Sequence, residues 1–307
     1  MKITLKIRQI VKIWMAVLLC NMMGCLHFHE GPLPNEPEKA QFMEIDGIRL
    51  RYDVRGTGPV VVLLHGFASS LDVWGRLVQD LESDYTIVRL DLKGFGWSER
   101  PEGDYSPQAQ ADLVWGMLEK LQIDKFALVG HSWGSSVALQ MALNQPTRIE
   151  RLALYDAWVY EEQLPAFFIW SRTPGFGETM FRLWYKERPE DRMAMAFHNP
   201  EIYIQESFSE SVDEGLDRPG TVRAALEAVR GQDYEAVQHR YKEISMPVLL
   251  LWGDSDQVAP LWVGQRLAAE LPYARLKVYG ACGHFPMIES YGSSTYDLVD
   301  FLSESGL

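Results

Sequence analysis

The chain is poor in cysteine and in basic residues, and each shortage excludes a class of protein. Only three of its 307 residues are cysteine, so a small fold held together by disulfides is excluded. Acidic residues outnumber basic ones, 42 against 29, giving a net charge of −13. An acidic surface repels phosphate, so we expect no nucleic-acid partner and no attachment through anionic lipid headgroups.

The signatures of common cofactors are also missing. The sequence contains no phosphate-binding loop, no dinucleotide-binding fingerprint and no histidine and cysteine cluster with zinc spacing. It has no internal repeat and no low-complexity segment. We therefore expect no metal and no cofactor, and the expected partner is a small-molecule substrate.

Acidic residues are absent from residues 1–25, a segment typical of an export signal. Its apolar stretch, residues 13–19, is followed by Gly24-Cys25 and preceded by four basic residues, Lys2, Lys6, Arg8 and Lys12. This order resembles a bacterial lipoprotein signal, in which the cysteine is lipidated. We expect an exported protein attached to the membrane on the periplasmic or cell-surface side. An uncleaved anchor is the second interpretation, and a buried N-terminal helix of a cytoplasmic protein is the third.

Residues 26–40 are rich in proline and glutamate, so we expect an exposed linker between the membrane and the folded domain. Cleavage before Cys25 would leave only Cys282 inside the fold, and no intramolecular disulfide could form. We interpret Cys282 as a packed small residue.

From residue 41 onward, the patterns of strands and helices alternate. An Asp46-Gly47 hairpin within residues 42–54 is followed by strands expected at 59–64, 85–90, 126–129, 149–155, 247–252 and 275–279. Helices are expected at 74–81, 107–121, 133–144, 261–270 and 297–303. Such alternation predicts an α/β fold with a mostly parallel central sheet flanked by helices.

The alternation is interrupted after the sixth predicted strand. Residues 157–244 have a helical pattern and are rich in aromatic side chains. We therefore predict a helical cap over residues 157–244, inserted into a sheet domain made of residues 41–156 and 245–307.

The strongest candidate for chemistry is the motif Gly130-His131-Ser132-Trp133-Gly134, which follows an apolar strand and precedes a helix. A serine at such a turn projects its hydroxyl from the end of the sheet, and the glycines allow the tight turn and close packing of the helix. A helix N-cap is the ordinary alternative role for Ser132.

An acid and a histidine follow two later strands. Asp254 and Asp256 follow the strand ending at Trp252, and His284 follows the strand ending at Tyr279. The carboxyl ends of parallel strands meet at one edge of a sheet, so these residues are expected beside Ser132. Histidine takes the serine proton, and a carboxylate orients the histidine and stabilises its charged form.

Several motifs together carry a family resemblance. They are His65-Gly66-Phe67 after a strand, the turn Asp91-Leu92-Lys93-Gly94-Phe95-Gly96-Trp97-Ser98, the serine motif, the acid loop 253–260 and the histidine loop 283–289. In this order they resemble the α/β-hydrolase fold family, from about Gln41 to the end of the chain. The resemblance implies a catalytic triad of Ser132, Asp256 and His284.

Other residues compete for the acid role or have structural interpretations. Asp254 and Asp156 are the alternatives to Asp256, and Asp156 ends the strand before the cap, a position that some members of the family use. We expect His65 to brace its own loop and Glu289 to act as a structural brace. His131 is not a triad candidate.

The resemblance also implies an oxyanion hole made of two backbone N–H groups, those of Phe67 and Trp133. Among the cap aromatics and their neighbours, we predict that Trp158, Phe168 and Trp184 contact the substrate. The cap's own core accounts for most of the remaining aromatic residues.

These features predict a serine hydrolase that cleaves a carboxylic ester, or a related acyl bond, of a small or medium apolar substrate. The alternatives are a peptidase of the proline iminopeptidase type and a carbon–carbon bond hydrolase. Serine at position 132 argues against the haloalkane dehalogenases and most epoxide hydrolases of the family, which use aspartate. A ligand-binding sensor and a structural membrane lipoprotein are the non-enzymatic alternatives.

Overall fold

The computed structural model describes residues 26–186, 189–204 and 206–304, without the side chains of residues 184, 189, 192 and 207–209. Its strands are β1 (Gln41–Ile45), β2 (Ile48–Arg55), β3 (Val60–Leu64), β4 (Thr86–Leu90), β5 (Phe126–His131), β6 (Ile149–Tyr155), β7 (Val248–Gly253) and β8 (Ala274–Tyr279). The helices of the sheet domain are α2 (Gly75–Leu81), α3 (Pro107–Lys120), α4 (Trp133–Asn144), α11 (Leu261–Glu270), α12 (Pro286–Glu289) and α13 (Tyr291–Ser303).

The eight strands form one sheet in the order β1-β2-β4-β3-β5-β6-β7-β8. Pairings β1–β2 and β2–β4 are antiparallel, and the others are parallel. This confirms the predicted α/β architecture with a mostly parallel sheet. The hairpin turn lies at Asp46 and Gly47, whose φ angles of 49° and 78° suit the tight turn that matches strand twist.

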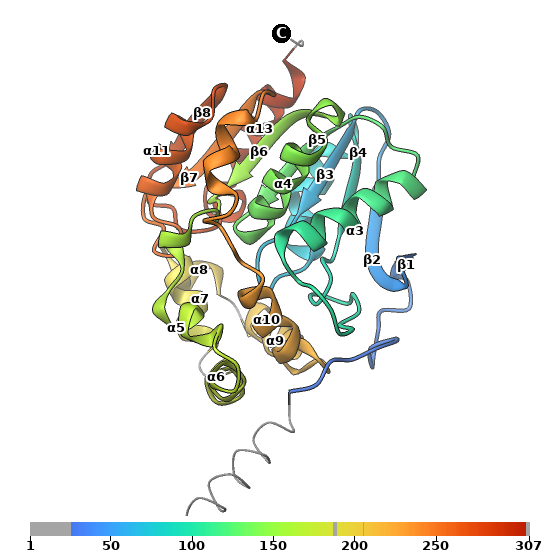
Figure 1. Ribbon diagram of the computed structural model, residues 1–307. Coiled ribbons are helices and arrows are strands. Elements are labelled where there is room, and N and C mark those ends of the chain that lie inside the picture. Colours follow the sequence, from blue (N-terminus) through green and yellow to red (C-terminus); the bar gives the residue numbers. More distant parts are fainter. Residues whose placement is uncertain (1–25, 187–188, 205, 305–307) are drawn as a thin grey trace, which may run out of the picture.

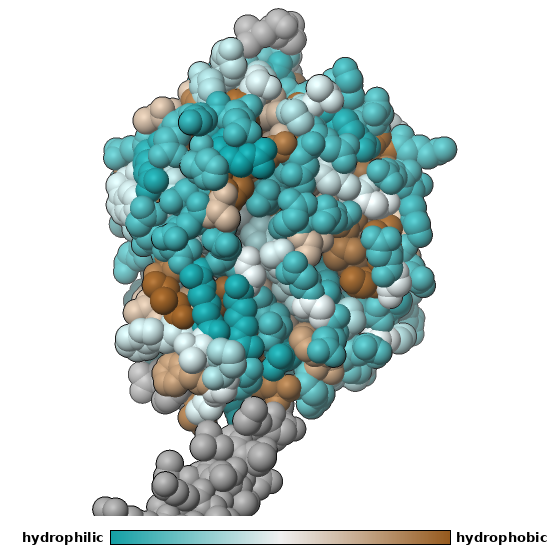
Figure 2. Space-filling model, in the orientation of Figure 1, coloured by the Kyte–Doolittle hydropathy of each residue, from teal (hydrophilic) through white to brown (hydrophobic). Residues whose placement is uncertain are grey.

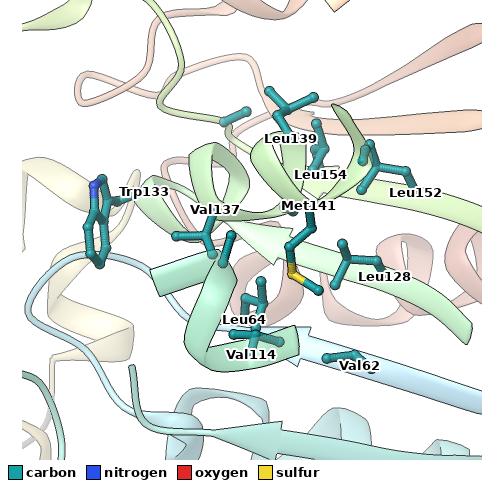
Figure 3. Close-up of a cluster of buried hydrophobic side chains, with 14 of the residues drawn as sticks. Val62, Leu64, Val114, Leu128, Trp133, Val137, Leu139, Met141, Leu152 and Leu154 are labelled. Carbon is teal, nitrogen blue, oxygen red and sulfur yellow. The ribbon is translucent and has the colours of Figure 1, made fainter. Parts of the chain in front are cut away.

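The sheet has a hydrophobic core on each face, and alternate residues of one strand reach opposite cores. In β3, Val62 and Leu64 join the core beneath α3, α4 and α11, whereas Val61 and Leu63 join the core beneath α2 and α13. Figure 3 shows part of the first core, where Met141 of α4 lies beside Leu128 of β5. Burial of α4 against the sheet fixes the start of that helix, where Ser132 lies.

The last helix begins earlier than predicted, at Tyr291 instead of residue 297. Gly292 and the serines at 293 and 294 have low helix propensity, which hid this turn in the sequence. The Ser294 hydroxyl donates to the carbonyl oxygen of Pro286 at 2.9 Å. That tertiary contact supports the helix start.

A helical cap lies between β6 and β7, as predicted, and it packs over one end of the sheet domain (Figure 1). Its helices are α5 (Ala166–Ser171), α6 (Phe176–Trp184), α7 (Pro189–Ala196), α8 (Pro200–Tyr203), α9 (Glu206–Asp217) and α10 (Thr221–Arg230). The cap has its own small core, made of Phe181, Tyr185, Ala225, Leu226 and Val229.

The segment 26–40, expected as an exposed linker, contacts the folded domain in its first part. His29 forms a two-way backbone pairing with Arg100, and Leu33 is buried. The Glu36 carboxylate binds the Arg49 guanidinium at 2.6 Å. Pairing to a sheet-domain loop therefore holds the segment down, a contact that composition alone does not reveal.

The predicted signal or anchor in residues 1–25 lies outside the described residues. Across the described part of the chain, no helix combines the length and the apolar character needed to span a bilayer.

Candidate active site

Ser132 sits at a sharp turn between β5 and α4 with φ 51° and ψ −123°. A positive φ is strained for a residue other than glycine and is characteristic of functional positions. The motif glycines allow this turn, since a Cβ on Gly130 would lie 2.9 Å from the backbone of Gly134, and a Cβ on Gly134 would lie 2.4 Å from the carbonyl oxygen of His65. The backbone therefore packs as closely around Gly130 and Gly134 as the sequence motif predicted.

The predicted acid, Asp256, and the predicted base, His284, are joined by a hydrogen bond. His284 Nδ1 lies 2.7 Å from Asp256 Oδ2, and both side chains are buried. Asp256 Oδ1 accepts the backbone N–H groups of Val258 and Ala259, at 2.7 and 2.9 Å. Those two amides fix the carboxylate, which in turn orients the imidazole so that Nε2 is left to accept a proton.

His131 connects the serine turn to the histidine loop. Its Nε2 lies 2.8 Å from the carbonyl oxygen of His284, and the two rings are 4.9 Å apart between centroids. Burial, reinforced by the charge of His284, holds the pKa of His131 well below its ordinary value. Neutral His131 therefore donates from Nε2 to the His284 carbonyl. Because His131 directly precedes Ser132, this hydrogen bond holds the loop of His284 against the serine turn.

The structure separates the three candidate acids. Asp254 is exposed, and its backbone N–H pairs with the carbonyl of Tyr279. Asp156 is fully buried and accepts the Gly253 N–H at 3.0 Å. Burial and the charge of Asp256 hold the pKa of Asp156 well above its ordinary value, which disfavours its charged form beside the acid that binds His284.

The loop after β3 passes directly over the serine turn. A Cβ on Gly66 would lie 3.0 Å from the Ser132 Cβ. His65 braces this loop as predicted, because Nδ1 contacts the Gly66 carbonyl at 2.7 Å and Nε2 accepts the Leu92 N–H at 2.9 Å. Trp133 is the first residue of α4, so its N–H has no intrahelical partner. Both predicted oxyanion donors thus lie on segments adjoining Ser132.

Aromatic rings line the region between this loop and the cap. The ring of Phe67 lies 5.4 Å from Phe95, 6.3 Å from Trp133 and 5.7 Å from Phe168 of the cap. Tyr185 of the cap also contacts Phe67, at 6.4 Å. Phe95 was not expected in the pocket, because nothing in its local sequence indicates that it faces Phe67. Tyr185 was one of the cap aromatics considered for an apolar pocket, but it was not among the three predicted substrate contacts.

The predicted substrate contacts have different outcomes. Trp158 is buried beside the site, where its backbone N–H donates to the Ser132 carbonyl at 3.1 Å and its ring lies 6.3 Å from Phe168. Phe168 lies between Trp158 and Phe67. The side chain of Trp184 is outside the described residues.

The cap also touches the histidine loop, a contact that the sequence does not indicate. The His284 N–H donates to the carbonyl of Ala196 at 2.7 Å, and the rings of Phe197 and Phe285 stack 5.0 Å apart. Ser132, Asp256 and His284 are only 4–6% exposed. The cap therefore covers the candidate triad closely.

The only described group of acidic, cysteine or histidine side chains close enough to hold a metal is Asp156, Asp256 and His284, whose ligand atoms lie within 4.8 Å of one another. The hydrogen bond between His284 Nδ1 and Asp256 already uses one nitrogen and one oxygen. The raised pKa of Asp156 opposes the deprotonated form that a metal ligand needs. The hydrogen-bonding pattern fits proton transfer better than metal binding.

Comparison with known proteins agrees with the fold. The sequence model for the alpha/beta hydrolase fold matches residues 59–291. An uncharacterized hydrolase of Bacillus subtilis strain 168 is 29% identical over 84% of this chain and 96% of its own length. A 2-hydroxymuconate semialdehyde hydrolase of Pseudomonas sp. strain CF600 is 28% identical over 88% of this chain and 96% of its own.

Among solved structures, Cfl2 from Burkholderia cenocepacia superimposes with a TM-score of 0.76 and 26% identity, over 88% of this chain and 99% of its own. The family match covers most of the chain, and the sheet order and the cap after β6 agree with it. This protein therefore belongs to the alpha/beta hydrolase fold family.

Proposed function

We propose that this protein is a serine hydrolase that cleaves a carboxylic ester of a small or medium apolar substrate through an acyl-enzyme on Ser132. The observation that carries this proposal is the 2.7 Å contact between His284 and Asp256, at the edge of the sheet where Ser132 adopts its strained turn. An activated serine nucleophile requires a nearby base that is oriented by a hydrogen-bonded acid. Asp256 and His284 form such a pair next to the turn that carries Ser132.

The proposed reaction has two steps. Ser132 Oγ attacks the ester carbonyl while His284 Nε2 takes its proton, and Asp256 stabilises the imidazolium. The N–H groups of Phe67 and Trp133 bind the oxyanion, a contact worth about 3 kcal/mol of transition-state stabilisation per donor. His284 then protonates the departing alcohol. Water attacks the acyl-enzyme with His284 as base, and the acid is released.

The apolar character of the substrate is inferred from the rings around the site. Phe67, Trp133 and Phe168 present aromatic surface beside Ser132, which favours an apolar acyl or alcohol group.

Cleavage of a carbon–carbon bond is the second candidate, and the 28% identity to the 2-hydroxymuconate semialdehyde hydrolase supports it. A peptidase of the proline iminopeptidase type ranks below it, because His65-Gly66-Phe67 lacks the further glycines of that class.

A substrate panel tests these proposals. Purified protein should hydrolyse p-nitrophenyl acetate and butyrate, and a fluorophosphonate should label Ser132. Ser132→Ala, which keeps the fold, should lose both reactions. Turnover of a vinylogous 1,5-diketone or of a prolyl arylamide, without ester turnover, would favour the respective alternative.

Absence of both ester turnover and phosphonate labelling, in a protein that still binds a ligand tightly, would contradict the enzyme and favour the sensor.

A further inference from the structure

The outer side of the cap hairpin formed by α5 and α6 is unusually apolar. Four large hydrophobic side chains there are 44–56% exposed: Ile169, Trp170, Phe176 and Leu183. Phe176 and Leu183 are seven residues apart in α6, which places them on one face of that helix. Exposing several such side chains together is costly for a surface in water and is typical of an interaction site.

The same hairpin is nearly free of acidic groups in an otherwise acidic chain. Residues 166–184 contain one carboxylate, Glu178, whereas the whole sequence has 42. The Glu178 side chain is only 12% exposed and is bonded at 2.9 Å to Arg230 of α10. The exposed face therefore carries little of the negative charge that dominates the rest of the protein.

The described chain begins at this end of the molecule (Figure 1). Leu26 packs against the cluster formed by Phe181 and Tyr185 of the cap with residues of α10. The 25 residues before it carry the apolar stretch 13–19 between basic residues and Cys25. A lipid on Cys25, the residue before Leu26, would therefore be attached beside the cap. Figure 2 shows a few hydrophobic residues among hydrophilic ones where the described chain begins.

We propose that the outer face of the α5–α6 hairpin lies on a lipid bilayer, beside the attachment of residues 1–25. Exposed tryptophan, phenylalanine and leucine, here on the two contacting surface helices α5 and α6, are the side chains that enter the boundary between headgroups and acyl chains. The net charge of −13 favours zwitterionic over anionic lipid. Stable membrane binding needs two binding elements. Residues 1–25 supply the first, and the exposed face of the hairpin supplies the second.

Two exposed tryptophans offer a matched test. Trp170 of α5 is 56% exposed on the proposed face, and Trp262 of α11 is 45% exposed on the sheet domain. Full-length protein is reconstituted in phosphatidylcholine vesicles. It carries Trp14→Phe, which removes the tryptophan fluorescence of residues 1–25. Tryptophan quenching by brominated phosphatidylcholine is then compared for added Trp170→Phe and Trp262→Phe.

We expect Trp170→Phe to remove most of the remaining quenching and Trp262→Phe to leave it unchanged. Leu183→Glu should reduce the quenching of Trp170, whereas Val278→Glu, a matched change on exposed β8, should not. Hydrolysis of a soluble ester by each variant checks that the protein is folded.

Equal quenching in the two tryptophan variants would overturn the proposal. The proposal would also be overturned if Trp170 were shielded from solvent without lipid. Such shielding could come from a dimer of the protein, or from packing of residues 1–25 onto the cap.

Discussion

The carboxylate of Glu289 in the histidine loop binds the backbone N–H of His198 in the cap, with 2.8 Å between oxygen and nitrogen. Its other oxygen accepts the N–H of Gly283, next to His284, at 2.7 Å. One side chain thus joins the cap to the loop that carries the candidate base. Glu289 was expected to be a structural brace, and the structure identifies both segments that it holds.

Replacing Glu289 by alanine should reduce both stability and turnover. Two backbone amides would lose their acceptor. The part-buried Gly283 N–H would cost about 1–3 kcal/mol if it stays shielded from water, whereas the exposed His198 N–H can turn to water at little cost. Looser positioning of His284 should lower kcat about tenfold, which corresponds to roughly 1.4 kcal/mol. Thermal melting and the separate values of kcat and KM check this prediction.

Glu201→Ala is the matched control, because Glu201 is an exposed carboxylate in the same part of the cap. Glu289→Gln keeps only one of the two acceptor oxygens, so its effect should be intermediate. Unchanged kcat in Glu289→Ala would argue that the cap contact does not influence His284.

His131→Ala should slow ester hydrolysis without a comparable rise in KM. The lost contact is the 2.8 Å bond from His131 Nε2 to the His284 carbonyl, which positions the base and does not touch the substrate. We expect kcat to fall about tenfold. His131→Gln restores an N–H donor and should recover part of the rate. Equal losses in both variants would show that ring packing, and not the hydrogen bond, is what matters.

Asp156 should make the protein less stable as the pH rises. Its carboxyl has a raised pKa, so the folded protein binds more protons than the unfolded chain above the ordinary value of 3.8. The stability from Asp156 is therefore present at low pH and is lost as the pH rises toward the folded pKa. Asp156→Asn mimics the protonated acid and should melt increasingly above the wild type as the pH is raised.

Melting temperatures measured from about pH 4 to 9 test this dependence. Asp254→Asn, at an exposed site of the same loop region, should follow the wild type. A melting difference for Asp156→Asn that does not vary with pH would contradict a raised pKa of Asp156.

Gly134→Ala should prevent stable folding of the serine turn. The new Cβ would lie 2.4 Å from the His65 carbonyl oxygen, and backbone cannot yield cheaply there. We expect a loss of about 3 kcal/mol or more. Gly292→Ala in α13 is the control, since nothing lies within 4 Å of its Cβ, and it should be neutral or stabilise by up to about 1 kcal/mol. Chemical denaturation of both variants gives the comparison.

Local sequence was sufficient for most of the sheet domain. The alternation of apolar strands and amphipathic helices predicted the order of elements, and Asp46-Gly47 predicted the hairpin. The start of α13 was missed because glycine and serine weaken its local helical signal. The contact of residues 26–36 with the sheet domain was missed because it depends on pairing with distant residues such as Arg49 and Arg100.

For the candidate site, spacing indicated Ser132, Asp256 and His284, because each follows a strand whose end lies at the same edge of the sheet. Spacing could not choose among Asp156, Asp254 and Asp256 without the family resemblance. The structure separates them by burial and by hydrogen bonding. Asp256 binds His284, whereas Asp156 accepts the Gly253 N–H.

The sequence by itself determined the sheet domain, the insertion of a cap and the identity of the candidate nucleophile, because these depend on periodicity and on short motifs. Only the tertiary structure decided which rings face Phe67, that His131 and the cap hold the loop of His284, and that burial beside Asp256 raises the pKa of Asp156. Those properties arise from burial and from contacts between residues far apart in the chain, which no local pattern encodes.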